Sequence, residues 1–279
     1  MLERNRQSIQ SVLRGWRPLL RYVFRCRISG LESLEDGPYL LVSNHNIGAA
    51  FEVMALLDAW ETRFAGEKPL YGLAHRIAFR IPVVASLFRK IGAVPATYES
   101  GYAVLDQGAS LAIFPGGNRE VTRSFLRRKT CDFGGHRGWA RIALSRGVPV
   151  VPVSITGSHS INPVLLRSQL LSTALILPRV LGIRWFPITA SQLIYMVLTF
   201  AILTSLQTPP WGVALGCFGI FLSAVLWPVW PAQIKIHVGN PVDLGPLVSA
   251  RMSESERLDI CYREISRRVQ GGMDLLNNS

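Results

Sequence analysis

The chain has 279 residues, of which 49% are apolar, and a formal net charge of +12 at neutral pH. A chain of this length can bury a substantial core. Basic proteins that bind nucleic acid are usually not also this apolar, so the composition argues against a nucleic-acid partner and favours a membrane. The four cysteines lie far apart and lack metal-ligand spacing, so we expect neither a metal site nor a disulfide framework.

The first thirty residues contain seven arginines but a single acid, Glu3, and apolar residues alternate with the arginines. This pattern predicts a basic amphipathic helix over residues 1–28 that contacts the surface of an anionic leaflet. The alternative is an ordinary surface helix that packs on the domain. No small-residue cleavage site follows, so a signal peptide is not expected.

Residues 39–43 form a short apolar run, which predicts a buried strand that ends just before His45. A helical pattern follows from Phe51 to Phe64, and Glu52 is the only carboxylate within twelve residues after His45. In a straight helix, seven residues separate two groups by about 10 Å. Contact between His45 and Glu52 therefore requires a non-helical turn over residues 46–49, for which Gly48 supplies the backbone freedom.

A histidine that is held by a carboxylate is a poised general base, because the carboxylate fixes the tautomer and stabilises the imidazolium. The spacing therefore predicts a catalytic pair of His45 and Glu52. Two simpler interpretations remain open at this point. In the first, His45 caps the helix, and in the second, it is merely a polar residue at the end of a strand.

Further strands are predicted over residues 68–73, 108–114 and 147–155, and they alternate with helical stretches over residues 74–90 and 138–146. This alternation is typical of an α/β fold, in which ligands collect at the carboxyl ends of the strands. One such end carries the turn Pro115-Gly116-Gly117-Asn118-Arg119-Glu120. Its glycines expose backbone N–H groups and Arg119 offers a planar fork for phosphate or carboxylate, although many such turns simply join two elements.

Residues 185–234 contain no Asp, Glu, Lys or Arg. Two apolar stretches, 186–206 and 211–230, approach the roughly 20 residues that a helix needs to cross a bilayer. Basic residues on both flanks predict that the remainder of the chain lies on the cytoplasmic side. The alternatives are a buried pair of helices or a pair that enters only one leaflet.

Four segments together resemble the glycerolipid and lysophospholipid acyltransferase superfamily in their order and separation. They are Ser43-Asn44-His45 with its following carboxylate, Phe114 to Glu120, residues 147–153 and residues 234–242. The resemblance implies a mixed α/β sheet flanked by helices, divided into residues 29–180 and 232–279. Residues 181–231 would form an inserted hydrophobic transmembrane hairpin, and a charged helix over 253–269 would close the domain.

The sequence departs from the usual pattern of that family at two places. Six residues instead of four separate the histidine from its acid, which is a glutamate, and the turn has Gly116 where the family usually has Glu. Both departures resemble the branch of diacylglycerol-type and ester-forming acyltransferases, in which the acceptor need not carry a phosphate.

The resemblance implies a membrane-bound O-acyltransferase in which His45, oriented by Glu52, is the general base. The acyl donor would be a thioester of coenzyme A or of acyl carrier protein, and neither a metal nor another cofactor would be required. The expected substrate-binding residues are Asn44, Gly116, Gly117, Asn118, Arg119 and Glu120. Two other functions remain open: a hydrolase that uses the same pair to activate water, and a non-catalytic scaffold that binds membranes.

Overall fold

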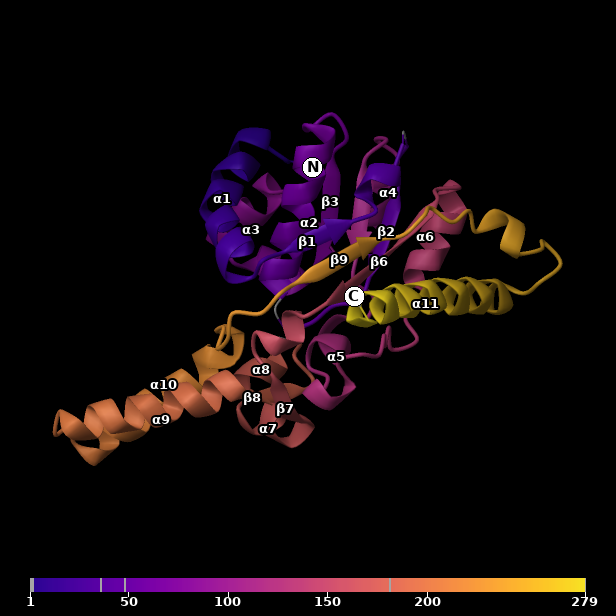
Figure 1. Cartoon of the computed structure of the whole chain (residues 1–279). Coiled ribbons are helices and arrows are strands. Elements are labelled where there is room, and N and C mark those ends of the chain that lie inside the picture. The colour runs from indigo at the N-terminus through magenta and orange to yellow at the C-terminus, as the bar shows by residue number, and fades with distance from the viewer. Residues whose placement is uncertain (1–2, 36, 48, 181, 279) are drawn as a thin grey trace.

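The computed structural model describes residues 3–35, 37–47, 49–180 and 182–278. Its centre is a seven-stranded sheet with the strand order β1-β9-β6-β2-β5-β3-β4 (Figure 1). Neighbouring strands are parallel except for β6 and β9, so the predicted mixed α/β sheet is confirmed. In chain order the strands are β1 (Arg27–Ser29), β2 (Leu40–Ser43), β3 (Leu70–Ala74), β4 (Ala93–Pro95), β5 (Ser110–Ile113), β6 (Val150–Thr156) and β9 (Lys235–Val238).

Helices cover both faces of this sheet, which explains why the central strands β2, β5 and β6 are buried along their whole length. One face packs against α1 (Arg6–Pro18) and α2 (Ala49–Phe64), with α3 (Pro82–Lys90) beside α1. The other face packs against α4 (Tyr98–Leu105), α6 (Gly138–Arg146) and α11 (Glu254–Asn278). The sheet therefore separates two apolar cores.

The polypeptide leaves β2 through a short irregular segment before α2 begins at Ala49. Asn46 and Ile47 are not helical, as the predicted contact between His45 and Glu52 requires. Gly48, to which we assigned the flexibility of this turn, lies outside the described residues. The helix starts two residues earlier than the apolar pattern indicated.

Two predicted helices have other boundaries in the structure. The stretch 74–90 is divided into a 3-10 helix (Arg76–Arg80) and α3, because Pro82 occupies the first turn of α3 and keeps Ile81 extended. The last helix does not end near residue 270 but continues through two glycines to Asn278. A Cβ atom on Gly272 would collide with the Ser154 side chain, so this glycine permits close packing of α11 on β6.

The N-terminal helix does not offer its apolar face to a membrane. Ile9 and Leu13 are fully buried in the same core as α2. An ion pair between Arg17 and Asp58 (2.8 Å) further fixes α1 to α2, and Arg4, just before α1, pairs with Glu61 of α2. The alternative interpretation, a surface helix that packs on the domain, is therefore the correct one for α1.

A second, small layer follows β6. It contains the antiparallel pair β7 (Val164–Ser168) and β8 (Phe186–Thr189), together with the short helices α7 (Gln169–Ala174) and α8 (Leu177–Val180). A short helix α5 (Gly117–Val121) lies next to it, where we predicted only a turn. Neither β7 nor β8 was expected from the sequence.

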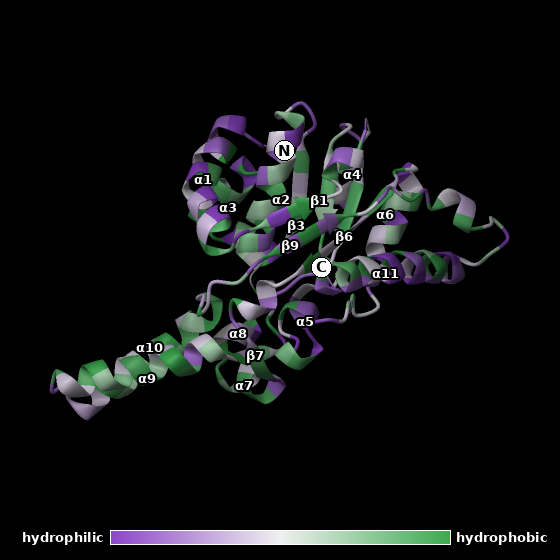
Figure 2. Cartoon of the chain, viewed as in Figure 1, coloured by the Kyte–Doolittle hydropathy of each residue, from purple (hydrophilic) through white to green (hydrophobic). Residues whose placement is uncertain are grey.

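Two apolar helices, α9 (Ala190–Ser205) and α10 (Pro210–Ser223), lie side by side and project away from the sheet (Figures 1 and 2). They are shorter than the predicted spans 186–206 and 211–230, because residues 186–189 pair as β8 and residues 224–226 form a 3-10 turn. Within the described part of the chain, no helix combines the length and the hydropathy that crossing a bilayer demands. The prediction of two transmembrane helices is therefore not supported.

Candidate active site

His45 and Glu52 meet at the carboxyl end of β2, on opposite sides of the irregular turn. Nδ1 of His45 lies 3.1 Å from Oε2 of Glu52. The carboxyl group is fully buried, whereas 15% of the His45 side chain is exposed. Because Nδ1–H donates to the carboxylate, Nε2 is the ring nitrogen that can accept a proton from outside.

The buried Glu52 carboxylate is held by two further donors. The Ser158 hydroxyl donates to Oε1, and the backbone N–H of Asn46 donates to Oε2 at 3.3 Å. Burial alone would raise the pKa of Glu52. The hydrogen bond from His45, the charge of His45 and the hydrogen bonds from Ser158 and Asn46 act in the opposite direction, so the pKa lies below its usual range. Glu52 is therefore ionised and can stabilise a protonated His45.

Ser158 was not recognised from the sequence, and its replacement gives a testable prediction. In Ser158→Ala, Glu52 loses one donor, so its pKa rises toward that of an unfolded glutamate. In the wild type the lowered pKa stabilises the fold above the usual glutamate pKa, and this contribution disappears as the pH falls through the lowered value. We expect the acid limbs of both activity and stability to move to higher pH in the variant, as measured by pH profiles and thermal melts. Unchanged profiles would show that the hydroxyl does not tune Glu52.

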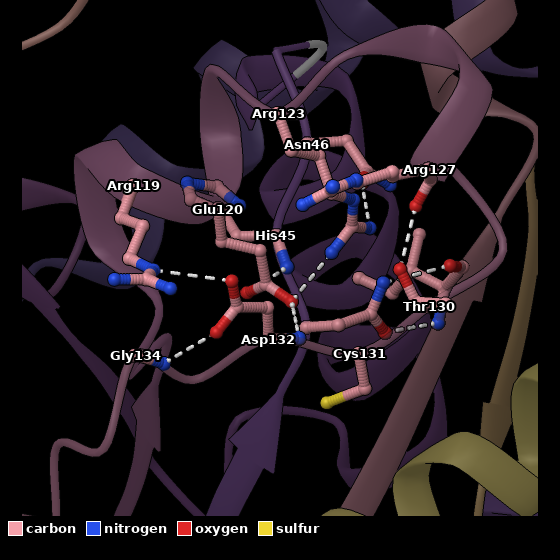
Figure 3. A network of polar contacts seen from close by, with 12 residues as sticks. His45, Asn46, Arg119, Glu120, Arg123, Arg127, Thr130, Cys131, Asp132 and Gly134 are labelled. Atoms are coloured by element: carbon pink, nitrogen blue, oxygen red, sulfur yellow. Dashed lines mark hydrogen bonds and ion pairs between the residues drawn. The ribbon is translucent and has the colours of Figure 1, made fainter.

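Glu120 was predicted to bind substrate, but in the structure its carboxyl group contacts the backbone of the chain. Its side chain is fully buried and its Oε2 accepts the backbone N–H of His45 at 2.9 Å, so it does not face a substrate (Figure 3). Oε1 accepts the N–H of Asp132 at 3.2 Å. Burial raises the pKa of Glu120 to about 7, although Arg123 and the two N–H groups act in the opposite direction. Glu120 thus positions the backbone of His45.

The position of Glu120 also explains Gly116. A Cβ atom on Gly116 would collide with the Glu120 side chain, from Cβ to the carboxylate. The acid that the family usually carries at position 116 is therefore excluded by the acid at 120. Packing against Glu120 is therefore sufficient to explain why a glycine occupies position 116, without a contact between Gly116 and a substrate.

Arg123 is the centre of the network around the histidine, and the sequence did not reveal this. Its side chain is 4% exposed. It donates from Nη1 to Glu120 (2.8 Å) and from Nη2 to the Asn46 side chain (2.7 Å) (Figure 3). It also donates from Nε to Nε2 of His159 (3.0 Å). Arg123 begins a basic stretch of the sequence that continues with Arg127, Arg128 and Lys129, yet its own side chain is buried. The available signal was its spacing of three residues from Glu120, typical of a pair on one helical turn.

His159 accepts from Arg123 and is therefore neutral. Burial, together with the charges of Arg123 and Arg128, lowers the pKa of this imidazole well below its usual value. A neutral Nε2 can accept the Arg123 N–H, whereas a protonated ring could not. These contacts and its burial give His159 a structural role in the network.

Asn44 is likewise a structural residue and not a substrate ligand. It is fully buried, and its side chain accepts from the Ile155 N–H at 2.7 Å and donates to the Ile155 carbonyl at 2.9 Å. These two bonds join the end of β2 to β6. Asn44 therefore fixes the direction in which the chain leaves the strand toward His45.

The other predicted residues of the turn differ in how accessible they are. Arg119 is about half exposed and pairs with Asp132 at 3.1 Å, so it remains available to an anionic group. Asn118 accepts the N–H of Trp185 at 3.3 Å and thereby ties the turn to β8. Gly117 adopts a φ of +46°, and its N–H donates to the Phe114 carbonyl at 3.2 Å. This N–H is used within the turn, so it does not point to a substrate.

An apolar cavity of about 60 Å³ is connected to the histidine through Phe114. The Phe114 ring packs on the His45 ring with 4.4 Å between centroids and also lines this cavity. The cavity lies between α2 and strands β3, β4 and β5. Its other lining residues are almost entirely apolar: Val53, Met54, Leu56, Leu57, Leu70, Tyr71, Gly72, Ile91, Gly92, Ala93 and Ala112.

An α/β sheet that presents an imidazole on a buried carboxylate, next to an apolar cavity, defines a candidate enzyme that removes a proton beside a hydrophobic substrate. Comparison with known proteins indicates the type of reaction. Residues 25–156 match the Acyltransferase family model. Over these residues the chain is similar to the acyltransferase family, which agrees with the resemblance found in the sequence.

The comparisons also give relatives in sequence and in structure. The chain is 33% identical over 178 residues to an uncharacterized protein of Mycobacterium tuberculosis and 32% identical to one of Mycobacterium leprae. The match covers 62% of this chain but 48% of the M. tuberculosis protein, so the chain spans about half the length of that relative. The crystal structure of PlsC, the 1-acyl-sn-glycerophosphate acyltransferase of Thermotoga maritima, matches 94% of this chain and 79% of its own, with a TM-score of 0.50 and 17% identity. At that identity the match concerns the fold alone.

Proposed function

We propose that this protein transfers a fatty acyl group from a thioester to a hydroxyl group of a lipid. The observation that carries the proposal is the contact between His45 and the buried, ionised Glu52, which leaves Nε2 to accept a proton. Nε2 removes the proton of the acceptor hydroxyl while its oxygen attacks the thioester carbonyl. The C–S bond then breaks, and the imidazolium returns the proton to the leaving thiolate. The products are an ester and a free thiol, and no metal takes part.

The donor is a thioester of coenzyme A or of acyl carrier protein. Both carry phosphate groups, for which the half-exposed Arg119 is a suitable partner. The packing of Gly116 against Glu120 supports an acceptor site without the usual acid of the turn. An acceptor that lacks a phosphate, such as a lipid alcohol, fits this change.

The direct test supplies the purified protein with radiolabelled acyl-CoA, and in parallel with acyl carrier protein thioester, together with a total lipid extract. Label in an ester-linked lipid supports acyl transfer. Label that appears only as free fatty acid would indicate a hydrolase instead. If neither donor is consumed, the non-catalytic scaffold replaces the proposed enzyme.

The apolar cavity supplies a prediction about chain length. Gly72 lines the cavity, and a Cβ atom added there meets no other atom within 4 Å, so the backbone leaves room for a side chain to begin at this position. In Gly72→Val that side chain takes up part of the cavity. Valine also suits a strand. We expect the preference to move toward shorter acyl chains. The ratio of kcat/KM for long over short chains should fall by about tenfold or more, since each methylene in an apolar pocket changes this ratio by a similar factor.

The matched control is Leu73→Val, one position further along β3. Leu73 packs into the core on the other face of the sheet and does not line the cavity. This variant should keep the wild-type chain-length preference in the same competition assay with mixed acyl-CoA thioesters. An unchanged preference in Gly72→Val would exclude this cavity as the acyl site.

A further inference from the structure

The α9–α10 pair exposes large apolar side chains in all directions. Half or more of each of Val197, Phe200, Ile202, Leu206, Trp211, Leu215 and Phe218 is exposed. α10, which the structure describes in full, contains no buried residue. A soluble surface rarely exposes so much contiguous apolar area, and Figure 2 shows this pair as the most hydrophobic projection of the chain.

Aromatic residues with polar tips gather where the pair joins the domain. Trp227 packs on Tyr195, whose hydroxyl donates to the Pro228 carbonyl, and half of Trp230 is exposed. On the other connection, Arg167 lies over the Trp185 ring at 4.6 Å. Tryptophan, tyrosine and arginine in this arrangement are typical of the boundary between hydrocarbon and headgroups.

An arginine groove lies beside the segment that returns from α10. The groove has a volume of about 570 Å³ and is lined by Arg17, Arg21, Arg25 and Arg27, with Asp58 as its only acid and Leu20 and Ile28 among its apolar residues. Asp58 is already paired with Arg17. The groove therefore carries an uncompensated positive charge that favours phosphate groups.

Backbone bonds connect the groove to the α9–α10 pair. Ile234, four residues after Trp230, donates to the Phe24 carbonyl at 3.0 Å and accepts the Arg27 N–H at 2.9 Å. At the other end, Arg167 donates to the Arg119 carbonyl at 2.8 Å, and Asn118 binds Trp185. Both connections of the pair are thus fixed to the end of the domain that carries His45.

We propose that the α9–α10 pair embeds in one leaflet of an anionic bilayer while the arginine groove binds the phosphates of its lipid headgroups. The helix α9 is about 24 Å long, against roughly 15 Å for the hydrocarbon of one leaflet, so the pair lies tilted. The domain then rests on the membrane with the histidine near the lipid acceptor. Only this last statement rests on the proposed acyl transfer, because docking itself needs no catalysis.

Vesicle flotation of the purified full-length chain tests the apolar half of the proposal. We compare vesicles of phosphatidylcholine alone with vesicles that also contain phosphatidylglycerol. Val197→Glu and Phe218→Glu alter exposed side chains and leave the fold intact, and each should lower vesicle binding at least tenfold. The matched control is Leu275→Glu on α11, also exposed and apolar but remote from the pair, which should bind like the wild type.

A second set of variants tests the role of the arginine groove. Arg21→Gln with Arg25→Gln should reduce binding to phosphatidylglycerol vesicles severalfold and flatten its salt dependence, but leave binding to neutral vesicles unchanged. Arg267→Gln with Arg268→Gln on α11 removes the same charge from exposed positions and serves as the control.

Three results would overturn the proposal. They are wild-type binding by the Glu variants, equal binding of the wild type to neutral and anionic vesicles, and a dimer in solution that the Glu variants dissociate. The third would make the pair a contact between two copies of the chain. His45→Ala must bind vesicles like the wild type, so a failure of docking is distinguished from a failure of the enzymatic mechanism.

Discussion

Replacement of His45 by alanine is expected to lower kcat for acyl transfer by about 10²- to 10⁴-fold, the usual contribution of a general base. The remaining rate would come from substrate positioning, which the variant retains. The fold should persist, because Glu52 keeps its bonds from Ser158 and Asn46, and Glu120 still accepts the backbone N–H of residue 45. Steady-state kinetics with labelled acyl-CoA, together with circular dichroism, measure both effects.

Two further variants separate the base from its orienting partner. Glu52→Gln keeps the shape of the side chain but cannot hold a protonated imidazole, so we expect a lower kcat with little change in KM. His237→Gln alters a histidine whose ring contacts Ser29 on the outer strands, away from the site, and should leave kinetics unchanged. If His45→Ala retained a tenth or more of the wild-type kcat, His45 would not be the base.

The contact between His45 and Glu52 was predictable because the two residues are close along the chain. One strand and one helix, both evident from apolar periodicity, hold His45 and Glu52, and only the turn between them had to be inferred. The strands β2, β5 and β6 were found for the same reason, since each is a short apolar run bounded by turn residues. Local patterns therefore revealed the framework of the site.

The residues that hold His45 and Glu52 in position were not predictable, because they come from distant parts of the chain. Ser158 contacts Glu52 across 106 positions, and Arg123 contacts Asn46 across 77. A serine or an arginine in a polar stretch is normally solvated, and nothing in its neighbours shows that tertiary packing will bury it. The substrate-contact predictions for Asn44 and Glu120 failed for the same reason.

Apolar patterns also left open what covers an apolar face. The N-terminal pattern and the α9–α10 pattern both suggested lipid, yet α1 buries Ile9 and Leu13 in the core whereas α9 and α10 expose most of theirs. Periodicity reports that a face is apolar but not which partner it meets. Only the packed structure distinguishes the two segments.

Replacement of Arg123 by methionine is expected to lower the free energy of unfolding by about 3–5 kcal/mol, because it leaves the buried Glu120 without its charged partner. Methionine keeps most of the length and the apolar stem of the side chain. Activity should fall as well, since Glu120 positions the backbone of His45 and Arg123 orients Asn46. Urea denaturation and acyl-transfer assays at 25 °C give the two quantities.

The loss of stability should depend on pH in a defined direction. Without Arg123, burial is less opposed, so the pKa of Glu120 rises above its present value of about 7. A carboxyl group with a raised pKa in the folded state favours folding below its unfolded pKa and loses this contribution as the pH rises through the folded pKa. The deficit of Arg123→Met relative to the wild type is therefore larger at pH 8 than at pH 6.

Two comparisons decide whether the buried pair causes these effects. Arg127→Ala removes an exposed arginine four residues away and should change the free energy of unfolding by no more than about 0.5 kcal/mol. Glu120→Gln in the Arg123→Met background removes the unpaired charge, so it should recover part of the stability and abolish the pH dependence. If the double variant were as unstable as Arg123→Met at pH 8, the cost would come from lost packing, because no buried charge would remain to explain it.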